Sequence, residues 1–459
     1  MAVQQSTTAV SGAVEGERGA RATRGAQQAT WLGVLALLGV LSLGRLLVAA
    51  FGYGIPAWFD EELNPLIALI SRGQPITQID ARQYGAVVFL VFDPALRVLM
   101  PTQGLNLSAL ATYATWVALC ATVVAFAFTA RRYAADATSG SRARLLVLLV
   151  AWSSAVPLLY VIAQHMVDAW QLAFLSVSLF LFTGSGRQRR FAGLPLAAAT
   201  LTKILPGLLL VYLCLRSWRA GLIGVAGVGL LLAVGQLLYG SLMGFGYPLA
   251  MLAGGGDTIA RWSTHFENNS IRGLLFKLGA GFRLRGDTEQ YILDPRLVPF
   301  LNVLAYALAA ALVGYLFLVA WRGRGRDSIA RRSIEFSLAI FTMLLVSPHT
   351  AQDYLVTTLP VLAVWLYLWS QRLPRPWSIR QTALGALAAL LIGVFVPMNL
   401  FARILPLGWL VNVTDNAHNI LFVDQIGSAI GAYEFFGFPG IGLLLGWLLL
   451  VRLERQTDA

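Results

Sequence analysis

The stretch VPFLNVLAYALAAALVGYLFLVA, residues 298–320, contains no charged side chain. As a helix that rises about 1.5 Å per residue, it is long enough to cross the ~30 Å hydrocarbon core of a bilayer. Apolar runs recur from Trp31 to the C-terminus, in a chain that is 57% hydrophobic and 12% charged and has a mean hydropathy of +0.69. Because backbone groups in lipid must bond within the protein, the sequence predicts an all-α polytopic membrane protein.

The order of these runs predicts about twelve crossings with both termini inside. The predicted spans are 31–50, 107–130, 143–162, 169–184, 191–202, 206–217, 220–240, 298–320, 333–347, 354–371, 381–400 and 435–451. Two long outer loops, about 51–106 and 241–297, are expected to carry juxtamembrane helices. We therefore expect a single integral-membrane domain over 31–452, with a disordered cytoplasmic arm at 1–30 and a cytoplasmic tail at 453–459.

The distribution of positive charge indicates topology. The chain has 34 basic and 22 acidic residues, a formal net charge of +12. Arginines gather where predicted spans end on one side, at 131–144, 187–190, 216–219, 322–332, 372–380 and 452–455. The positive-inside rule makes that side cytoplasmic, so nucleic-acid binding has no support. Cys120 and Cys214 fall within predicted spans and define neither a disulfide framework nor a metal site.

Unusual polar residues fall on the opposite, outer side. Each alone has an ordinary explanation, such as a solvated loop for the acids or a snorkelling side chain for Lys203. Ionisable groups at membrane depth cost on the order of 3 kcal/mol, so their convergence indicates a functional cavity. A transporter or lipid flippase would also use one, but transporters tend to show internal repeats, and none is found. The outer set comprises Asp60–Glu62, QHMVD (164–168), Lys203, HFENNSIRG (265–273) and SPHTAQDY (347–354).

Lys203 lies between the two shortest predicted spans. The motif TKILP, residues 202–206, contains a proline that ends or starts a helix. We therefore predict two half-length helices that meet within the membrane at this motif. The span that follows contains four glycines, which we expect to allow close helix packing: Gly221, Gly224, Gly227 and Gly229.

Carboxylates, lysine, arginine and histidine on one membrane face suit a particular type of reaction. A carboxylate can act as general base toward a hydroxyl, while the cationic groups can hold a phosphate and neutralise its charge as it leaves. Transfer of a sugar from a lipid phosphate needs both functions. Because a phosphate leaves with little help from an acid, one carboxylate suffices for an inverting displacement, whereas glycoside hydrolysis normally uses two.

Three motifs in succession carry a family resemblance. They are LFTGSGRQRRFAGLPLAAATLTKILPGLLLVYLCLRSWRA (181–220), ENNSIRGLL (267–275) and LLVSPHTAQDYLVTTLPVLAVWL (344–366). Their order and spacing resemble glycosyltransferase family 87, bacterial mannosyltransferases of the GT-C type that use polyprenyl-phosphate mannose. The similarity covers roughly residues 150–370. It implies a GT-C-like fold and an active site that faces outward from the bacterial cytoplasmic membrane.

The resemblance also implies residue roles. Asp60, the first acid after the first span, matches the general base, with Glu61 as the alternative. Lys203 and His349 would contact the donor phosphate, and Arg272 is a further phosphate ligand. Substrate contacts are expected from the remaining polar residues of the outer face: Glu267, Asn269, His165, His265 and Asp353.

The expected partners are a polyprenyl-phosphate sugar donor, a glycolipid or glycan acceptor, and the lipid bilayer. Mannose, arabinose and glucose would all present the same phosphate to the site. No cofactor is expected, and no tight Asp/His cluster indicates a metal, although loop carboxylates could supply one.

Overall fold

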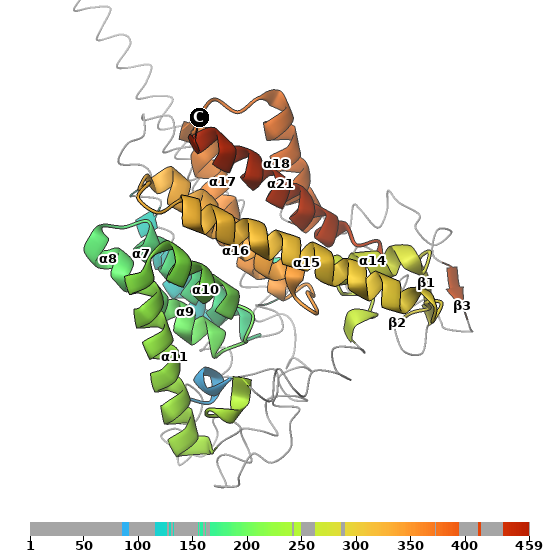
Figure 1. Ribbon diagram of the computed structural model, residues 1–459, viewed down its shortest axis with the longest axis horizontal. Helices are drawn as coiled ribbons and strands as arrows, with labels where there is room; N and C mark the ends of the chain where they lie inside the picture. The colour runs from blue at the N-terminus through green and yellow to red at the C-terminus, as the bar shows by residue number, and fades with distance from the viewer. Residues whose placement is uncertain are drawn as a thin grey trace, which may run out of the picture.

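The computed structural model describes residues 85–90, 115–125, 128–129, 132, 155, 157–158, 161, 166–240, 243–248, 262–285, 290–371, 373–393, 412–414 and 435–458. The chain there is mostly helical (Figure 1). The helices include Thr115–Ala125, α7 (Asp168–Phe182), α8 (Gly186–Arg190), α9 (Gly193–Thr200), α10 (Gly207–Arg216), α11 (Trp218–Tyr239), α14 (Ile271–Gly279), α15 (Leu297–Arg322), α16 (Ile329–Val346), the 3-10 helix η3 (Tyr354–Thr358), α17 (Leu359–Gln371), α18 (Ile379–Ile392) and α21 (Phe438–Asp458). The predicted arm at 1–30 and the span at 31–50 lie outside these residues.

Each predicted span from 169–184 onward coincides with a helix, as far as the structure describes it. Within the described residues, two helices are long and apolar enough to cross a membrane, α11 and α15. Only 28% of the apolar window of each is buried, so most of their side chains are free to face lipid. Helices α9 and α10, of 8 and 10 residues, are about 12 and 15 Å long. The twelve full crossings therefore remain a prediction.

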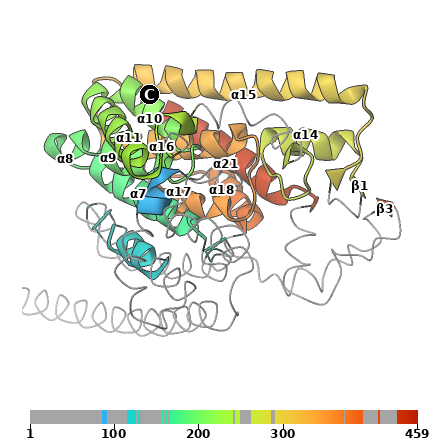
Figure 2. The same cartoon turned by 90° about the horizontal axis from the view of Figure 1, so that it is seen from below.

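The all-α prediction missed a small sheet. Strand β1 (Arg283–Arg285) pairs antiparallel with β2 (Gln290–Tyr291) and parallel with β3 (Asn412–Thr414), which gives the order β2-β1-β3. Strands this short show no alternation that a sequence pattern could reveal. The sheet lies beyond the N-terminal end of α15, and that helix runs along one side of the molecule away from it (Figure 2).

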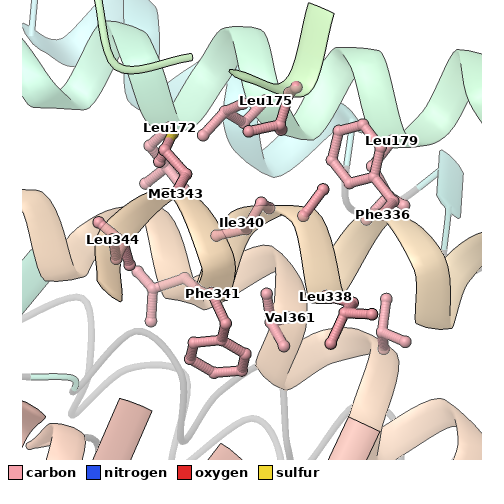
Figure 3. Packing of buried hydrophobic residues seen from close by; sticks show 14 of the residues in the cluster. Leu172, Leu175, Leu179, Phe336, Leu338, Ile340, Phe341, Met343, Leu344 and Val361 are labelled. Atoms are coloured by element: carbon pink, nitrogen blue, oxygen red, sulfur yellow. The ribbon is translucent and has the colours of Figure 1, made fainter. Parts of the chain in front are cut away.

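The core is built around α16. Residues 331–345 of this helix are all buried, and the helix contacts α7, α10, α15, α17 and α21. Figure 3 shows how leucines of α7 meet the bulky side chains of α16 in an apolar layer. A helix that is enclosed on every side has no lipid-facing stripe, so α16 is the interior helix of the bundle.

Close packing joins α11 to its neighbours α9 and α10. A Cβ at Gly221 would lie 2.4 Å from Cα of Cys214, and one at Gly224 would lie 2.9 Å from the carbonyl oxygen of Gly193. One at Gly227 would come within 3.1 Å of Cβ of Ala197. The predicted role of the glycines is confirmed for these three, whereas Gly229 faces open space.

A buried ion network ties together the ends of α10, α16 and α21. Glu335 accepts from Arg216 at 2.5 Å and from Arg331 at 2.7 Å, and Arg331 also pairs with Glu454 at 3.1 Å. These four side chains are at least nine-tenths buried. In the sequence, Arg216 and Arg331 served only as a topology signal. The structure shows that each also compensates a buried acid, which would otherwise be strongly destabilising.

Candidate active site

One cation and two acids meet at the other end of the helix bundle. Nζ of Lys203, in the turn between α9 and α10, lies 2.7 Å from Oδ2 of Asp168 and 3.0 Å from Oδ2 of Asp353. Asp168 is the first residue of α7, and Asp353 directly precedes η3. All three side chains are buried. Burial of charge requires such pairing, and we call these three residues the Lys203 cluster.

The local structure explains how Lys203 reaches this place. Helix α9 closes with the N–H of Lys203 donating to the carbonyl of Ala199 at 3.1 Å. Pro206 is the N-cap residue of α10, a position where its missing N–H costs no helical hydrogen bond. Two short helices thus meet at TKILP, as predicted. Their depth in the bilayer stays a prediction.

Asp353 is the acid of the cluster that lies in a loop. Burial would raise the pKa of Asp353, but the Lys203 ammonium and its hydrogen bond hold it below the ordinary value. Asp353 is therefore ionised at neutral pH. The Lys203 ammonium also lies 4.1 Å from the ring centroid of Tyr354, a cation–π geometry.

His349, in the loop after α16, packs against the same tyrosine. Its ring centroid lies 6.1 Å from that of Tyr354, 5.0 Å from Trp262 and 6.4 Å from His265. Burial lowers the pKa of His349 to about 4, so its imidazole is neutral at neutral pH. We expected a cation here, whereas the neutral imidazole offers a hydrogen-bonding ring. Its Nδ1 has no hydrogen-bond partner among the described residues.

Two asparagines connect the loop before α14 to the loop that carries His349. Asn268 accepts from the N–H of Thr350 at 3.2 Å and donates to the carbonyl of Pro348 at 2.9 Å. The N–H of Asn269 donates to the carbonyl of Thr350 at 2.7 Å. Both asparagines are fully buried. Asn269, predicted as a substrate contact, thus holds the His349 loop in place, and so does Asn268, which the prediction did not include.

Glu267 and His265 lie beside this connection. The N–H of Glu267 donates to Nδ1 of His265 at 3.4 Å, and the Glu267 carboxylate lies 3.8 Å from the same nitrogen. Because His265 stacks near Trp262 at 4.9 Å, both residues are close to His349. The structure brings these two predicted residues to the candidate site.

Arg272 has different surroundings. Its guanidinium lies 5.4 Å from the ring centroid of Phe276 and 5.7 Å from that of Tyr306, between α14 and α15. Within the described part of the chain no recorded contact joins it to Lys203 or His349. No described contact supports a role for Arg272 at the donor phosphate, and that role stays a prediction.

Three predicted site residues lie outside the described residues: Asp60, Glu61 and His165. A residue that the prediction left out, Asp168, is the nearer partner of Lys203. Asp168 is the last residue of the motif QHMVD. An acid at the start of an apolar segment is the sequence feature that could have identified it as a site residue. Within the described residues, no group of three or more histidine, cysteine or acidic side chains could hold a metal ion.

These features define an α-helical membrane protein with a buried ion cluster where two short helices meet. The family model described as glycosyltransferase family 87 matches residues 86–348, more than half of the chain. The chain belongs to this family and is a glycosyltransferase. Neither a curated protein nor a solved structure matches it. The match contains Lys203, ends one residue before His349 and begins after Asp60.

Proposed function

We propose that this glycosyltransferase moves a sugar, with mannose as the first choice, from a polyprenyl-phosphate donor to a glycolipid or glycan acceptor. The reaction takes place on the outer face of a bacterial plasma membrane. The observation that best supports a charged lipid donor is the Lys203 cluster, with His349 on the same tyrosine ring. A buried lysine beside a neutral imidazole supplies the charge and the hydrogen bonds that a phosphate needs.

Charge balance suggests how the phosphate reaches Lys203. With Asp353 ionised and His349 neutral, the charge of Lys203 is already balanced within the cluster, so no positive charge is left over to attract a second anion. The phosphate would therefore take the place of one carboxylate. Asp353 is the acid that moves, because it lies in a loop and its side chain is 12% exposed, against 1% for Asp168 at the start of α7. Asp168 then keeps Lys203 in position.

The acceptor hydroxyl needs a base, and we assign this role to Asp60, with Glu61 as the alternative. The base takes the hydroxyl proton while the hydroxyl oxygen attacks the anomeric carbon, and the bond from that carbon to the phosphate oxygen breaks with its electrons going to the phosphate. One displacement of this kind inverts the anomeric centre. The polyprenyl phosphate leaves as an anion that Lys203 stabilises.

The test is a transfer assay with the purified chain in lipid nanodiscs. Polyprenyl-phosphate mannose, arabinose and glucose are offered with a panel of lipid acceptors, and products are identified by mass. Wild type should transfer one of these sugars, Asp60→Asn should lose at least about a hundredfold in rate, and Glu61→Gln should retain activity. If Asp60→Asn kept full activity and Glu61→Gln lost it, the general base would be Glu61 instead of Asp60. Absence of transfer from every lipid phosphate by wild type would refute the proposed donor class.

A further inference from the structure

Two glutamines next to the Lys203 cluster are buried without hydrogen-bond partners. Gln171 is 0% exposed and Gln352 is 3% exposed. For each, both the amide nitrogen and the amide oxygen lack a partner among the described residues. A buried primary amide that satisfies none of its donors and acceptors is rare in a folded protein. Such a group is suited to bind a polar ligand.

The positions of these glutamines tie them to the cluster. Gln171 lies three residues after Asp168 on α7, so the two side chains leave the same face of the helix, with Cβ atoms about 5–6 Å apart. Gln352 directly precedes Asp353. Each acid that holds Lys203 thus has an unpaired amide within one helical turn or one residue.

Other polar side chains of α7 show that burial on this helix does not by itself leave a group unpaired. Ser176 donates to the carbonyl of Leu172 at 2.6 Å, and Ser178 donates to the carbonyl of Ala192 at 2.8 Å. Gln171 therefore differs from its neighbours on the same helix. The contrast argues that its amide serves something other than the packing of α7.

Two further unpaired atoms lie at the same site. Oδ1 of Asp168 has no partner among the described residues, and neither has the hydroxyl of Tyr247. Tyr247 is near enough for the charge of Lys203 to influence it. The unpaired groups are therefore both donors and acceptors, and most of them are uncharged. A ligand rich in hydroxyl groups, each of which donates and accepts, matches this set better than an anion does.

We propose that Gln171 and Gln352 bind the hydroxyl groups of the donor sugar and so determine which sugar the enzyme accepts. The inference rests on the proposed function, since the sugar is placed next to a phosphate at Lys203. Amides that pair with the correct hydroxyls stay unpaired when a sugar lacks a hydroxyl or presents it in the other orientation. A site that must leave buried polar groups unpaired rejects such a sugar strongly.

The test separates the sugar from its lipid phosphate. Affinities for polyprenyl-phosphate mannose and for bare polyprenyl phosphate are measured on the full chain in nanodiscs, with wild type, Gln171→Met and Gln352→Met. Methionine keeps the volume and removes the amide. Each variant should weaken binding of the mannosylated lipid about tenfold per lost hydrogen bond, with binding of bare polyprenyl phosphate unchanged. Gln456→Met is the matched control, because Gln456 accepts from Gln381 near the C-terminus of α21 and should change neither affinity.

The outcomes separate the two proposals. If wild type binds neither lipid, the proposed function fails first. If wild type binds both lipids and the variants weaken both equally, or neither, the glutamines do not bind the sugar. Gln171→Leu and Gln352→Leu remove the same amides, so they repeat the comparison if a methionine variant fails to fold.

Discussion

Lys203 and Lys277 are the two lysines of the chain, and both are buried. Lys203 holds Asp168 and Asp353, which lie 35 and 150 residues away along the chain. Lys277 contacts Oδ1 of Asn269 at 3.5 Å, and Asn269 in turn binds the His349 loop. A lysine ammonium keeps three donors on a long stem, so one side chain can join segments that are far apart in sequence. Both lysines therefore help to shape the same site.

The buried imidazole of His349 gives a pH-dependent stability. Its pKa is lowered from 6.5 to about 4. Between pH 4 and pH 6.5 the imidazole is therefore protonated in the unfolded chain and neutral in the folded chain. The stability from the neutral imidazole is complete above about pH 6.5 and is lost as the pH falls toward 4. We expect the loss to be on the order of 1–3 kcal/mol.

The measurement compares thermal unfolding of wild type and His349→Gln in detergent from pH 7.5 to 4.5. Other titrating groups contribute equally to both proteins, so the difference between the two unfolding midpoints isolates His349. Wild type should lose stability relative to the variant as the pH falls. A difference that stays constant with pH would mean that His349 is not held neutral by burial.

At the scale of helices, Gly221 lies at a close contact between α10 and α11. A Cβ at Gly221 would come within 2.4–2.7 Å of Cα, Sγ and N of Cys214. Gly221→Ala should therefore destabilise the protein by about 1–3 kcal/mol. Gly229→Ala, in the same helix but facing open space, shares the gain in helix propensity and should be neutral or stabilising. Equal unfolding midpoints for the two variants would show that α10 and α11 are not in such close contact.

Glu335 should matter for folding without affecting the donor. Glu335→Leu leaves Arg216 and Arg331 buried without this acid, which we expect to cost about 3–5 kcal/mol. Glu335 lies twelve positions before Ser347 along α16, about 18 Å from the His349 loop. The unfolding midpoint should therefore drop while the KM for the donor in the folded fraction stays unchanged. A raised KM with an unchanged midpoint would place the network in donor binding.

Helix positions were predictable because the period and length of apolar runs are local properties of the chain. The proximity of Lys203 and His349 was also predictable, because each follows an apolar segment that ends on the predicted outer side of the membrane. The partners of Lys203 were not predictable, because no local pattern links residues 35 and 150 positions apart. The pairing of Glu335 with Arg216 across 119 positions was missed for the same reason. Such ion pairs form only where the fold brings distant segments of the chain together.

Across the described part of the molecule, polar groups form two layers with an apolar layer between them. The Glu335 network lies at the N-terminal end of α16, and the His349 loop follows its C-terminal end. The leucines of α7 and the large side chains of α16 fill the space between (Figure 3). Helix α15 is 26 residues long, about 39 Å, which exceeds the hydrocarbon thickness of a bilayer. The two polar layers thus lie at opposite ends of α16, and the predicted topology assigns them to opposite faces of the membrane.

This arrangement makes the orientation of the active site testable. Arg296 is exposed at the N-terminal end of α15, and Arg375 is exposed in the turn between α17 and α18. The predicted topology places Arg296 outside and Arg375 inside. In a background with Cys120→Ala and Cys214→Ala, a membrane-impermeant maleimide should label Arg296→Cys in intact spheroplasts. It should label Arg375→Cys only after the membrane is permeabilised.

The same substitution at two exposed arginines makes each variant the control for the other. Labelling of both in intact spheroplasts would mean that the membrane is leaky or that the chain does not span it between these residues. The reverse pattern would turn the Lys203 cluster toward the cytoplasm, where a soluble nucleotide sugar could replace the lipid-linked donor. The labelling pattern therefore constrains the donor as well as the topology, because the side on which Lys203 opens determines which activated sugars can reach it.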